Sequence, residues 1–230
     1  MRYLIANWKA QMTKNDIVQW AYEFSTLMQK NSEENKALKS ALEKNSLQII
    51  ICPPFPHIML TGKLLSDYNG IYMGAQTVSP KEPGKFTGEV TAATLHEICG
   101  YVLIGHSERR SHFNESEEDI QNQIQQCVRE KIAQILCVRN GNDIVYPEAQ
   151  IVAYEPSDAI GTGENADVSE VIDMKSKLKL SNDTVFLYGG SVDSDNIEGY
   201  LLTGQIDGFL VGTASLDPDK FYQMAVSMSK

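Results

Sequence analysis

The chain has 230 residues, 42% of them hydrophobic and 22% charged, which is the composition of an ordinary globular domain. A formal net charge of −10 argues against a nucleic-acid surface, because duplex binding requires a basic face. The apolar runs are far shorter than the roughly 20 residues that span a bilayer, so no membrane segment is expected.

The N-terminal sequence and the spacing of the cysteines predict the cellular location of the protein. The first apolar run meets Asn7 and Lys9 too early to form the hydrophobic part of a signal peptide. The cysteines form no Cys-x-x-Cys pair and no dense disulfide pattern, which favours reduced thiols in a cytoplasmic protein. They are Cys52, Cys99, Cys127 and Cys137.

Short runs rich in Ile, Leu, Val and Tyr recur along the chain without strict polar alternation, as is typical of parallel strands covered on both faces. Eight such strands are predicted, at Arg2–Asn7, Leu47–Cys52, Ile71–Ala75, Tyr101–Gly105, Ala133–Val138, Ile151–Tyr154, Val185–Tyr188 and Gly208–Val211.

Amphipathic stretches between these runs predict helices, with apolar residues at steps of three and four. Ser116, followed three residues later by Asp119, has the pattern of a helix N-cap. The predicted helices are Asp16–Lys30, Ser116–Lys131, Ser169–Leu180, Ser194–Thr203 and Pro218–Met228.

This alternation predicts one α/β domain over residues 1–230, a closed (β/α)₈ barrel, with an open doubly wound sheet as the alternative fold. Two connections are unusual. Arg139–Gln150 is about the shortest crossover that a parallel pair allows, so the helix between the fifth and sixth strands is expected to be shortened or missing. Thr77–Gly88 is a long loop, and such loops are usually functional or lie at an interface.

Polar residues stand where predicted strands end, and in this fold those ends meet at one mouth. Asn7 and Lys9 follow the first strand, two residues apart, so both side chains can point to the same side. Burial of Glu155 behind the sixth strand would raise its pKa and make it a base near neutrality. His106 precedes a possible helix, whose positive end would lower its pKa and favour a neutral ring. Taken singly, Glu155 could equally be a solvated acid, whereas a structural histidine and a surface lysine are the more common roles for residues such as His106 and Lys9.

Glycine-bearing turns end the seventh and eighth strands, at Gly189-Gly190-Ser191 and Gly212-Thr213. Their backbones can approach an anion closely, and N–H groups there suit a phosphate. Gly161–Ala166 matches a dinucleotide pattern, but it lies too far beyond its strand for that site and suits a hinged lid better. His96–Cys99 lacks the second histidine of a zinc motif.

Taken in order, several segments together resemble triosephosphate isomerase over nearly the whole chain. They are Asn7-Trp8-Lys9, Gly74-Ala75-Gln76, Phe86-Thr87-Gly88-Glu89, Gly105-His106-Ser107-Glu108-Arg109-Arg110, Ala153-Tyr154-Glu155-Pro156, Ala159-Ile160-Gly161-Thr162-Gly163, Tyr188-Gly189-Gly190-Ser191 and Asp207-Gly208-Phe209-Leu210-Val211-Gly212.

The resemblance implies a TIM barrel that interconverts dihydroxyacetone phosphate and D-glyceraldehyde 3-phosphate through an enediolate, in glycolysis and gluconeogenesis. It implies that Glu155 shuttles the proton and that neutral His106 polarises the carbonyl. Lys9, with Asn7 beside it and Glu108 supporting it, would supply positive charge. The implied phosphate ligands are backbone N–H groups of Gly161, Ser191, Gly212 and Thr213.

By the same resemblance, the loop Thr77–Gly88 reaches into the mouth of a second copy and makes a homodimer. Gln76 and Thr87 would belong to this contact, with Thr87 near the partner's Lys9. Neither a metal nor an organic cofactor is implied.

Departures from the family pattern concern the lid and its surroundings. Ser157 and Asp158 stand where the family usually has an apolar residue and a tryptophan, and Arg139 and Asn140 replace a glycine and a glutamate. Thr213 replaces a second glycine, which a backbone donor tolerates if φ stays negative.

Two other functions compete with the isomerase. One is a Schiff-base aldolase acting on a sugar phosphate, which would require a desolvated lysine, often at the end of one of the later strands. The other is a barrel that binds phosphate without turnover. The joint presence of Lys9, His106 and Glu155 favours the isomerase over both.

Overall fold

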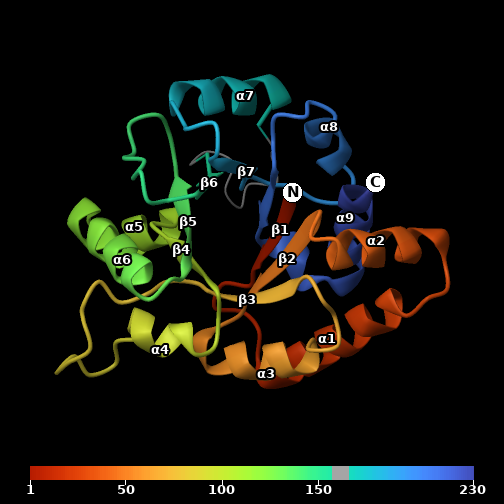
Figure 1. The fold of residues 1–230 in the computed structure, drawn as a ribbon, viewed down its shortest axis with the longest axis horizontal. Helices are drawn as coiled ribbons and strands as arrows, with labels where there is room; N and C mark the ends of the chain where they lie inside the picture. The colour runs from red at the N-terminus through yellow and green to blue at the C-terminus, as the bar shows by residue number, and fades with distance from the viewer. Residues whose placement is uncertain (157–165) are drawn as a thin grey trace.

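The computed structural model describes residues 1–156 and 166–230. The described residues form eight parallel strands that pair in chain order and close into a barrel, with β1 paired to both β2 and β8. Helices surround the strands (Figure 1). The predicted (β/α)₈ barrel is confirmed, and the open sheet is wrong. The strands are β1 (Arg2–Asn7), β2 (Leu47–Cys52), β3 (Ile71–Ala75), β4 (Tyr101–Ile104), β5 (Ala133–Val138), β6 (Ile151–Tyr154), β7 (Val185–Tyr188) and β8 (Gly208–Val211).

The strand bounds agree with those predicted except at the end of β4. Gly105 was expected to close this strand, but its φ of +69° is left-handed and ends the strand at Ile104. This turn leads directly into a helix, so His106 sits between the two elements.

Alternation along the strands divides the core in two. In β1, Tyr3 and Ile5 belong to an inner cluster, whereas Leu4 and Ala6 belong to the cluster that packs against the helices. Successive strand residues point to opposite faces, so every second residue fills the barrel. The inner cluster consists of Tyr3, Ile5, Ile50, Cys52, Leu103, Ile135, Cys137, Ile151, Ala153, Leu187 and Leu210.

All five predicted helices form. The N-cap prediction is confirmed, because Ser116 Oγ accepts the Asp119 N–H at 3.1 Å and Asp119 Oδ2 accepts the Ser116 N–H at 3.0 Å. These helices are α1 (Lys14–Met28), α6 (Glu117–Arg129), α7 (Val168–Lys177), α8 (Ile197–Leu201) and α9 (Pro218–Ser229).

Helix α8 is shorter than the predicted span of residues 194–203. Asp193 Oδ1 accepts the backbone N–H groups of Asp195 and Asn196, at 3.0 and 3.2 Å. These bonds hold the residues before Ile197 in a turn rather than in a helix, as short polar side chains commonly do.

Further helices supplement the predicted set. Helix α2 has a helical pattern that the sequence analysis missed: Leu38, Ala41 and Leu42 are buried at steps of three and four, and Ser32 caps the helix by accepting the Asn35 N–H at 3.2 Å. Helix α4 has five residues, too few for a helical period to be visible. These elements are α2 (Glu33–Glu43), α3 (Ile58–Leu64), α4 (Ala92–His96), α5 (Ser107–His112) and the 3₁₀ turns η1 (Phe55–His57) and η2 (Thr213–Leu216).

Residues 139–150, all of which the structure describes, contain no helix, as predicted. An ion pair closes this connection instead: Arg139 Nε and NH2 donate to Asp143 at 3.0 and 2.6 Å, and the Arg139 N–H donates at 2.7 Å. Tyr146 Oη donates to the Glu117 carbonyl of α6 at 3.1 Å. Side-chain hydrogen bonds therefore fasten the loop that replaces the helix.

This ion pair predicts a pH-dependent contribution to stability. Burial would raise the pKa of Asp143, but the hydrogen bonds from Arg139 outweigh it and the pKa is lowered. A lowered pKa stabilises the fold above the unfolded value near 3.9, and this stabilisation is lost as the pH falls through the folded value. We expect Asp143→Asn to lower the free energy of unfolding at pH 7 by about 1.5–3 kcal/mol, the size of a hydrogen bond to a charged group.

Urea unfolding of the wild type and the variant measures this difference, which should narrow as the pH is lowered below about 4. Asp183→Asn, at an exposed position, is the matched control and should change little. A variant as stable as the wild type at pH 7 would contradict the stabilising role of the pair.

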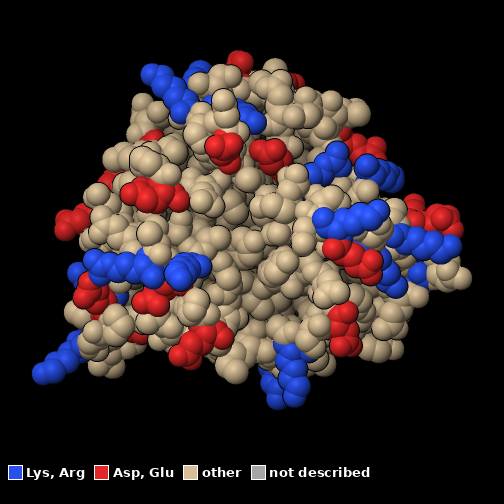
Figure 2. Space-filling view, viewed as in Figure 1, with Lys and Arg blue, Asp and Glu red and all other residues tan. Residues whose placement is uncertain are grey.

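Charge is mixed on the face drawn in Figure 2, where acidic and basic side chains lie around the edge and the centre is uncharged. Within residues 1–156 and 166–230, no helix has the length and apolar character needed to cross a membrane.

Candidate active site

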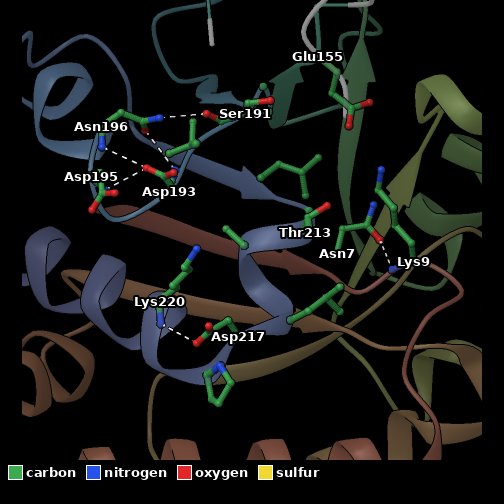
Figure 3. A pocket seen from close by; sticks show the side chains of 18 of the residues that line it. Asn7, Lys9, Glu155, Ser191, Asp193, Asp195, Asn196, Thr213, Asp217 and Lys220 are labelled. Atoms are coloured by element: carbon green, nitrogen blue, oxygen red, sulfur yellow. Dashed lines mark hydrogen bonds between the residues drawn. The ribbon is translucent and has the colours of Figure 1, made fainter. Parts of the chain in front are cut away.

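A cavity of about 970 Å³ opens where the strands end. Lys9 and Glu155 border it from one side, the turn at Ser191 borders it from the other, and Thr213 lies between (Figure 3). The structure thus gathers most of the predicted site residues around one space. Those that line it are Asn7, Lys9, His106, Glu155, Ser191, Gly212 and Thr213.

Strand alternation explains why polar side chains meet there. Asn7 continues the inward series of Tyr3 and Ile5, and Glu155 continues that of Ile151 and Ala153. Asn7 and Glu155 are only 5% and 2% exposed. They form the uppermost inward layer of the barrel, directly above its apolar filling.

Lys9 is held by contacts to both its backbone and its side chain. Its φ is +50°, an uncommon value for a residue with a side chain. Asn7 Oδ1 accepts the Lys9 N–H at 3.1 Å, and Gln76 Nε2 donates to the Lys9 carbonyl at 2.8 Å. Lys9 Nζ lies 2.5 Å from Glu108 Oε1. These contacts fix the ammonium group at the mouth of the cavity.

His106 lies between Glu108 and Glu155. Its Nδ1 accepts the Glu108 N–H at 3.2 Å, and its Nε2 lies 2.9 Å from Glu155 Oε1. A nitrogen that accepts a hydrogen bond carries no proton, so the ring proton is assigned to Nε2, which donates to Glu155. This is the neutral form of the ring.

The expected direction of the His106 pKa shift is wrong. Burial lowers the pKa of His106, but the adjacent Glu155 carboxylate and Glu108 together outweigh burial and the pKa is raised. The end of the six-residue helix α5 does not decide the shift, because a charge in direct contact is stronger than a helix terminus.

The expected rise in the Glu155 pKa is also wrong for this arrangement. Burial does raise it, but His106 and the Ser107 N–H, 3.3 Å from Oε2, outweigh burial and the pKa is lowered. In this state Glu155 is a paired carboxylate. Its partners must be removed before burial can make it a stronger base.

The neighbouring turn leaves little room around Glu155. A Cβ added to Gly189 would lie 2.9 Å from Glu155 Cγ, so a larger residue at this position would displace the carboxylate. The spacing and strand placement of Gly189 pointed to phosphate, whereas the structure also gives it this steric role.

The proposed phosphate ligands Ser191, Gly212 and Thr213 border the same cavity as Glu155. Thr213 begins η2 and is not among the described non-glycine residues with positive φ, so the condition for replacing the family glycine is met. A Cβ on Gly212 would lie 3.5 Å from Lys9 Cε, so this turn adjoins the ammonium. Asn196 Nδ2 donates to the Ser191 carbonyl at 3.0 Å. The predicted phosphate ligand Gly161 and the lid residues Ser157 and Asp158 lie outside the described residues.

Two features of the site were not expected from sequence. Gln76, placed by resemblance at the dimer loop, also donates to the carbonyls of Lys9 and Cys52 in its own chain. The buried Cys137 thiol adjoins Glu155, and burial followed by that carboxylate raises its pKa. Cys137 could have been found from the sequence, because it lies two residues after Ile135 and therefore points into the barrel as Ile135 does. Among the described residues, no group of three or more His, Cys, Asp and Glu side chains is arranged to hold a metal.

Comparison with known proteins places the chain in a family. The model of the triosephosphate isomerase family matches residues 2–145 and 143–228. The chain belongs to the triosephosphate isomerase family. Triosephosphate isomerases of Aquifex aeolicus (strain VF5) and Dictyoglomus thermophilum are 34% and 33% identical to it, each over 98% of this chain and 99% of their own length. That of Mesomycoplasma hyopneumoniae (strain 7448) is 32% identical, with the same coverage.

The resemblance drawn from the motifs is therefore confirmed, and with it the expectation that the chain is an isomerase. The two matched segments of the triosephosphate isomerase pattern meet at residues 143–145, inside the connection without a helix.

Proposed function

We propose that the chain interconverts dihydroxyacetone phosphate and D-glyceraldehyde 3-phosphate, in glycolysis and gluconeogenesis, by proton transfer through an enediolate. One observation carries the proposal: Lys9, His106 and Glu155 border the same cavity, with Glu155 and His106 2.9 Å apart. A base, a hydrogen-bond donor and a fixed positive charge around one space are what this reaction requires.

Phosphate binding comes first in the proposed reaction. Backbone N–H groups of Ser191, Gly212 and Thr213 surround the phosphate, joined by Gly161 from the connection after β6. Lys9 adds the positive charge that an acidic protein needs at this point. Holding the phosphate orients the two reacting carbons toward Glu155.

Proton transfer then uses the pair that the substrate separates. Glu155 takes a proton from the carbon beside the carbonyl, while His106 Nε2–H donates to the carbonyl oxygen and an enediolate forms. Glu155 returns its proton to the neighbouring carbon, and His106 moves the hydroxyl proton between the two oxygens. Once Glu155 has left His106, burial raises the pKa of Glu155 and lowers that of His106, as the reaction needs.

Lys9 stabilises the negative charge on the enediolate oxygen. Asn7, Gln76 and Glu108 keep the ammonium in place through the contacts at its backbone and at Nζ. These three residues act on Lys9 and serve as positioning residues in the proposed reaction.

The aldolase alternative is less consistent with these contacts. A Schiff base requires an unpaired amine as nucleophile, whereas Lys9 Nζ is in an ion pair with Glu108. Phosphate binding alone does not require the His106–Glu155 pair. Neither alternative therefore accounts for all the residues of the site.

A coupled assay tests the proposal. With glyceraldehyde 3-phosphate as substrate, the purified protein should generate dihydroxyacetone phosphate, whose reduction by a dehydrogenase consumes NADH. Inorganic phosphate should inhibit competitively because it occupies the same N–H groups. Absence of turnover with either triose phosphate would refute the isomerase function.

A homodimer through the loop Thr77–Gly88 is part of the proposal. A second cavity, of about 590 Å³, lies between this loop and the segment that carries Arg109 and Phe113. Phe86 and Phe113 border it and are 46% and 67% exposed. Large exposed aromatic side chains around a hollow suit burial by a partner protein.

The loop is also linked to the active site within one chain, because Gln76 at its base holds the Lys9 carbonyl. A second copy that orders the loop would therefore help to order Lys9, and Thr87 would lie near the partner's Lys9. One domain spanning residues 1–230 and a cytoplasmic location complete the proposal, the latter resting on the spacing of the cysteines.

A further inference from the structure

Tyr146 lies in the connection that replaces the helix between β5 and β6, and it contacts the start of α6. Its Oη lies 3.1 Å from the Glu117 carbonyl oxygen and 3.2 Å from Glu117 Oε2. Both acceptors belong to one residue, so the hydroxyl holds the backbone and the side chain of Glu117 together. Burial and the Glu117 carboxylate raise the pKa of Tyr146 to about 12, which keeps the hydroxyl protonated as a donor.

The other carboxylate oxygen of Glu117 holds Arg110. Arg110 NH1 donates to Glu117 Oε1, and Arg110 Nε donates to the Gly105 carbonyl at 2.8 Å. The arginine side chain is only 4% exposed, and its NH2 has no hydrogen-bond partner in the part of the chain that the structure describes. These two bonds therefore fix the orientation of the guanidinium group, and one of them depends on Glu117.

The Gly105 carbonyl belongs to the peptide group that joins β4 to His106. Because a peptide group is planar, an anchored carbonyl also sets the direction in which the His106 backbone leaves the turn. The guanidinium group packs directly against this turn, since a Cβ on Gly105 would lie 3.0 Å from Arg110 NH2. A movement of Arg110 would therefore be passed on to the backbone of His106.

The placement of His106 matters because its ring acts at short range. Nε2 lies 2.9 Å from Glu155 Oε1, and the proposed reaction requires the same nitrogen to reach the carbonyl oxygen of the substrate. A misplacement of about 1 Å in an active site can cost about 10²-fold in rate. A path of hydrogen bonds thus runs from Tyr146 through Glu117 and Arg110 to the turn that carries His106.

We propose that Tyr146 is a positioning residue of the isomerase: it holds Glu117, Glu117 orients Arg110, and Arg110 fixes the turn from which His106 reaches the substrate. The proposal rests on the proposed function of this site. The described residues that line the cavity do not include Tyr146, Glu117 or Arg110, so Tyr146 acts only through the groups that it holds. The connection without a helix thereby supports the active site as well as the fold.

Tyr146→Phe removes the hydroxyl and keeps the ring. We expect kcat to fall about five- to tenfold, the size of one lost hydrogen bond, and KM for glyceraldehyde 3-phosphate to stay within about twofold, because no phosphate ligand changes. His106 contributes to the lowered pKa of Glu155. When the ring is held less firmly, burial should raise that pKa, and the acidic limb of the pH profile of kcat/KM should move to higher pH.

Glu117→Gln is a second variant that interrupts the same path. The carboxamide keeps the size of the side chain, but one of its two ends carries N–H donors and no longer accepts a bond from Arg110 or Tyr146. It should lower kcat and move the acidic limb in the same direction. Lys9 and Glu108, the other charged groups that act on His106, are unchanged in both variants.

The ring nitrogen signals of His106 in NMR spectra test the path without turnover, and the Nε2 signal should shift in both variants. Tyr68→Phe is the matched control, because this partly buried tyrosine also donates to a helix carbonyl, that of Ser25 at 3.3 Å, and does not border the cavity. Unchanged His106 signals or an unchanged pH profile in Tyr146→Phe, or equal changes in Tyr68→Phe, would overturn the positioning role. Wild-type protein without isomerase activity would instead refute the proposed function, and the His106 signals would then still show whether Tyr146 positions the ring.

Discussion

Glu155→Gln is expected to lower kcat in both directions by about 10³- to 10⁴-fold, the contribution of a well-placed general base. The carboxamide keeps the size of the side chain and can still form a hydrogen bond with His106 Nε2, so the cavity should keep its shape. It cannot accept the carbon-bound proton. Only the chemical step is lost.

Phosphate binding should survive this change, because Glu155 is not one of the proposed phosphate ligands and its side chain lies apart from Ser191 and Thr213 (Figure 3). The inhibition constant of inorganic phosphate should therefore stay within about twofold of the wild type, the spread of a change that removes no binding contact. Glu148→Gln, an exposed glutamate in the loop before β6, is the control and should leave kcat unchanged. Turnover of Glu155→Gln at the wild-type rate would end the assignment of Glu155 as the base.

Deletion of residues 80–85 is expected to give monomers with low activity. The base of the loop should survive, because the Ser79 N–H donates to the Val90 carbonyl at 2.8 Å. The deletion removes the part of the loop that would enter a second copy and leaves Phe86 and Phe113 in water. Activity should fall because Gln76, which holds Lys9, loses the ordering that a partner gives to the loop.

Sedimentation velocity on the deletion variant and the wild type measures the assembly, and the coupled assay measures the activity of the same samples. Thr87→Arg is a milder second variant that places a charge in the proposed interface. Thr26→Arg, on the exposed side of α1, is its matched control and should remain dimeric. A fully active monomer, or a deletion variant that still dimerises, would contradict the role of the loop.

Much of the site was predictable because strand parity and strand ends are properties of the sequence. Two-residue alternation carries Asn7 into the barrel after Tyr3 and Ile5, and parallel strands bring the residues that follow them to one mouth. The missing helix followed from chain length alone, since residues 139–150 are too few for a full crossover.

Other features depend on distances between segments far apart in the chain. The pKa directions of His106 and Glu155 were predicted wrongly because each is governed by the other residue, 49 positions away in sequence and 2.9 Å away in space. The length of α8 depended on the side chain of Asp193, whose hydrogen bonds compete with helix formation.

The sequence by itself determined the order of the strands, the residues at their ends and the family, because periodicity, spacing and motifs are local properties of the chain. Only the tertiary structure decided which of those residues pair. It placed Gln76 on Lys9 and Glu155 on His106. Hydrogen bonds and ion pairs depend on differences of a few tenths of an ångström between chain-distant atoms, and these distances are set by the packing of the whole barrel.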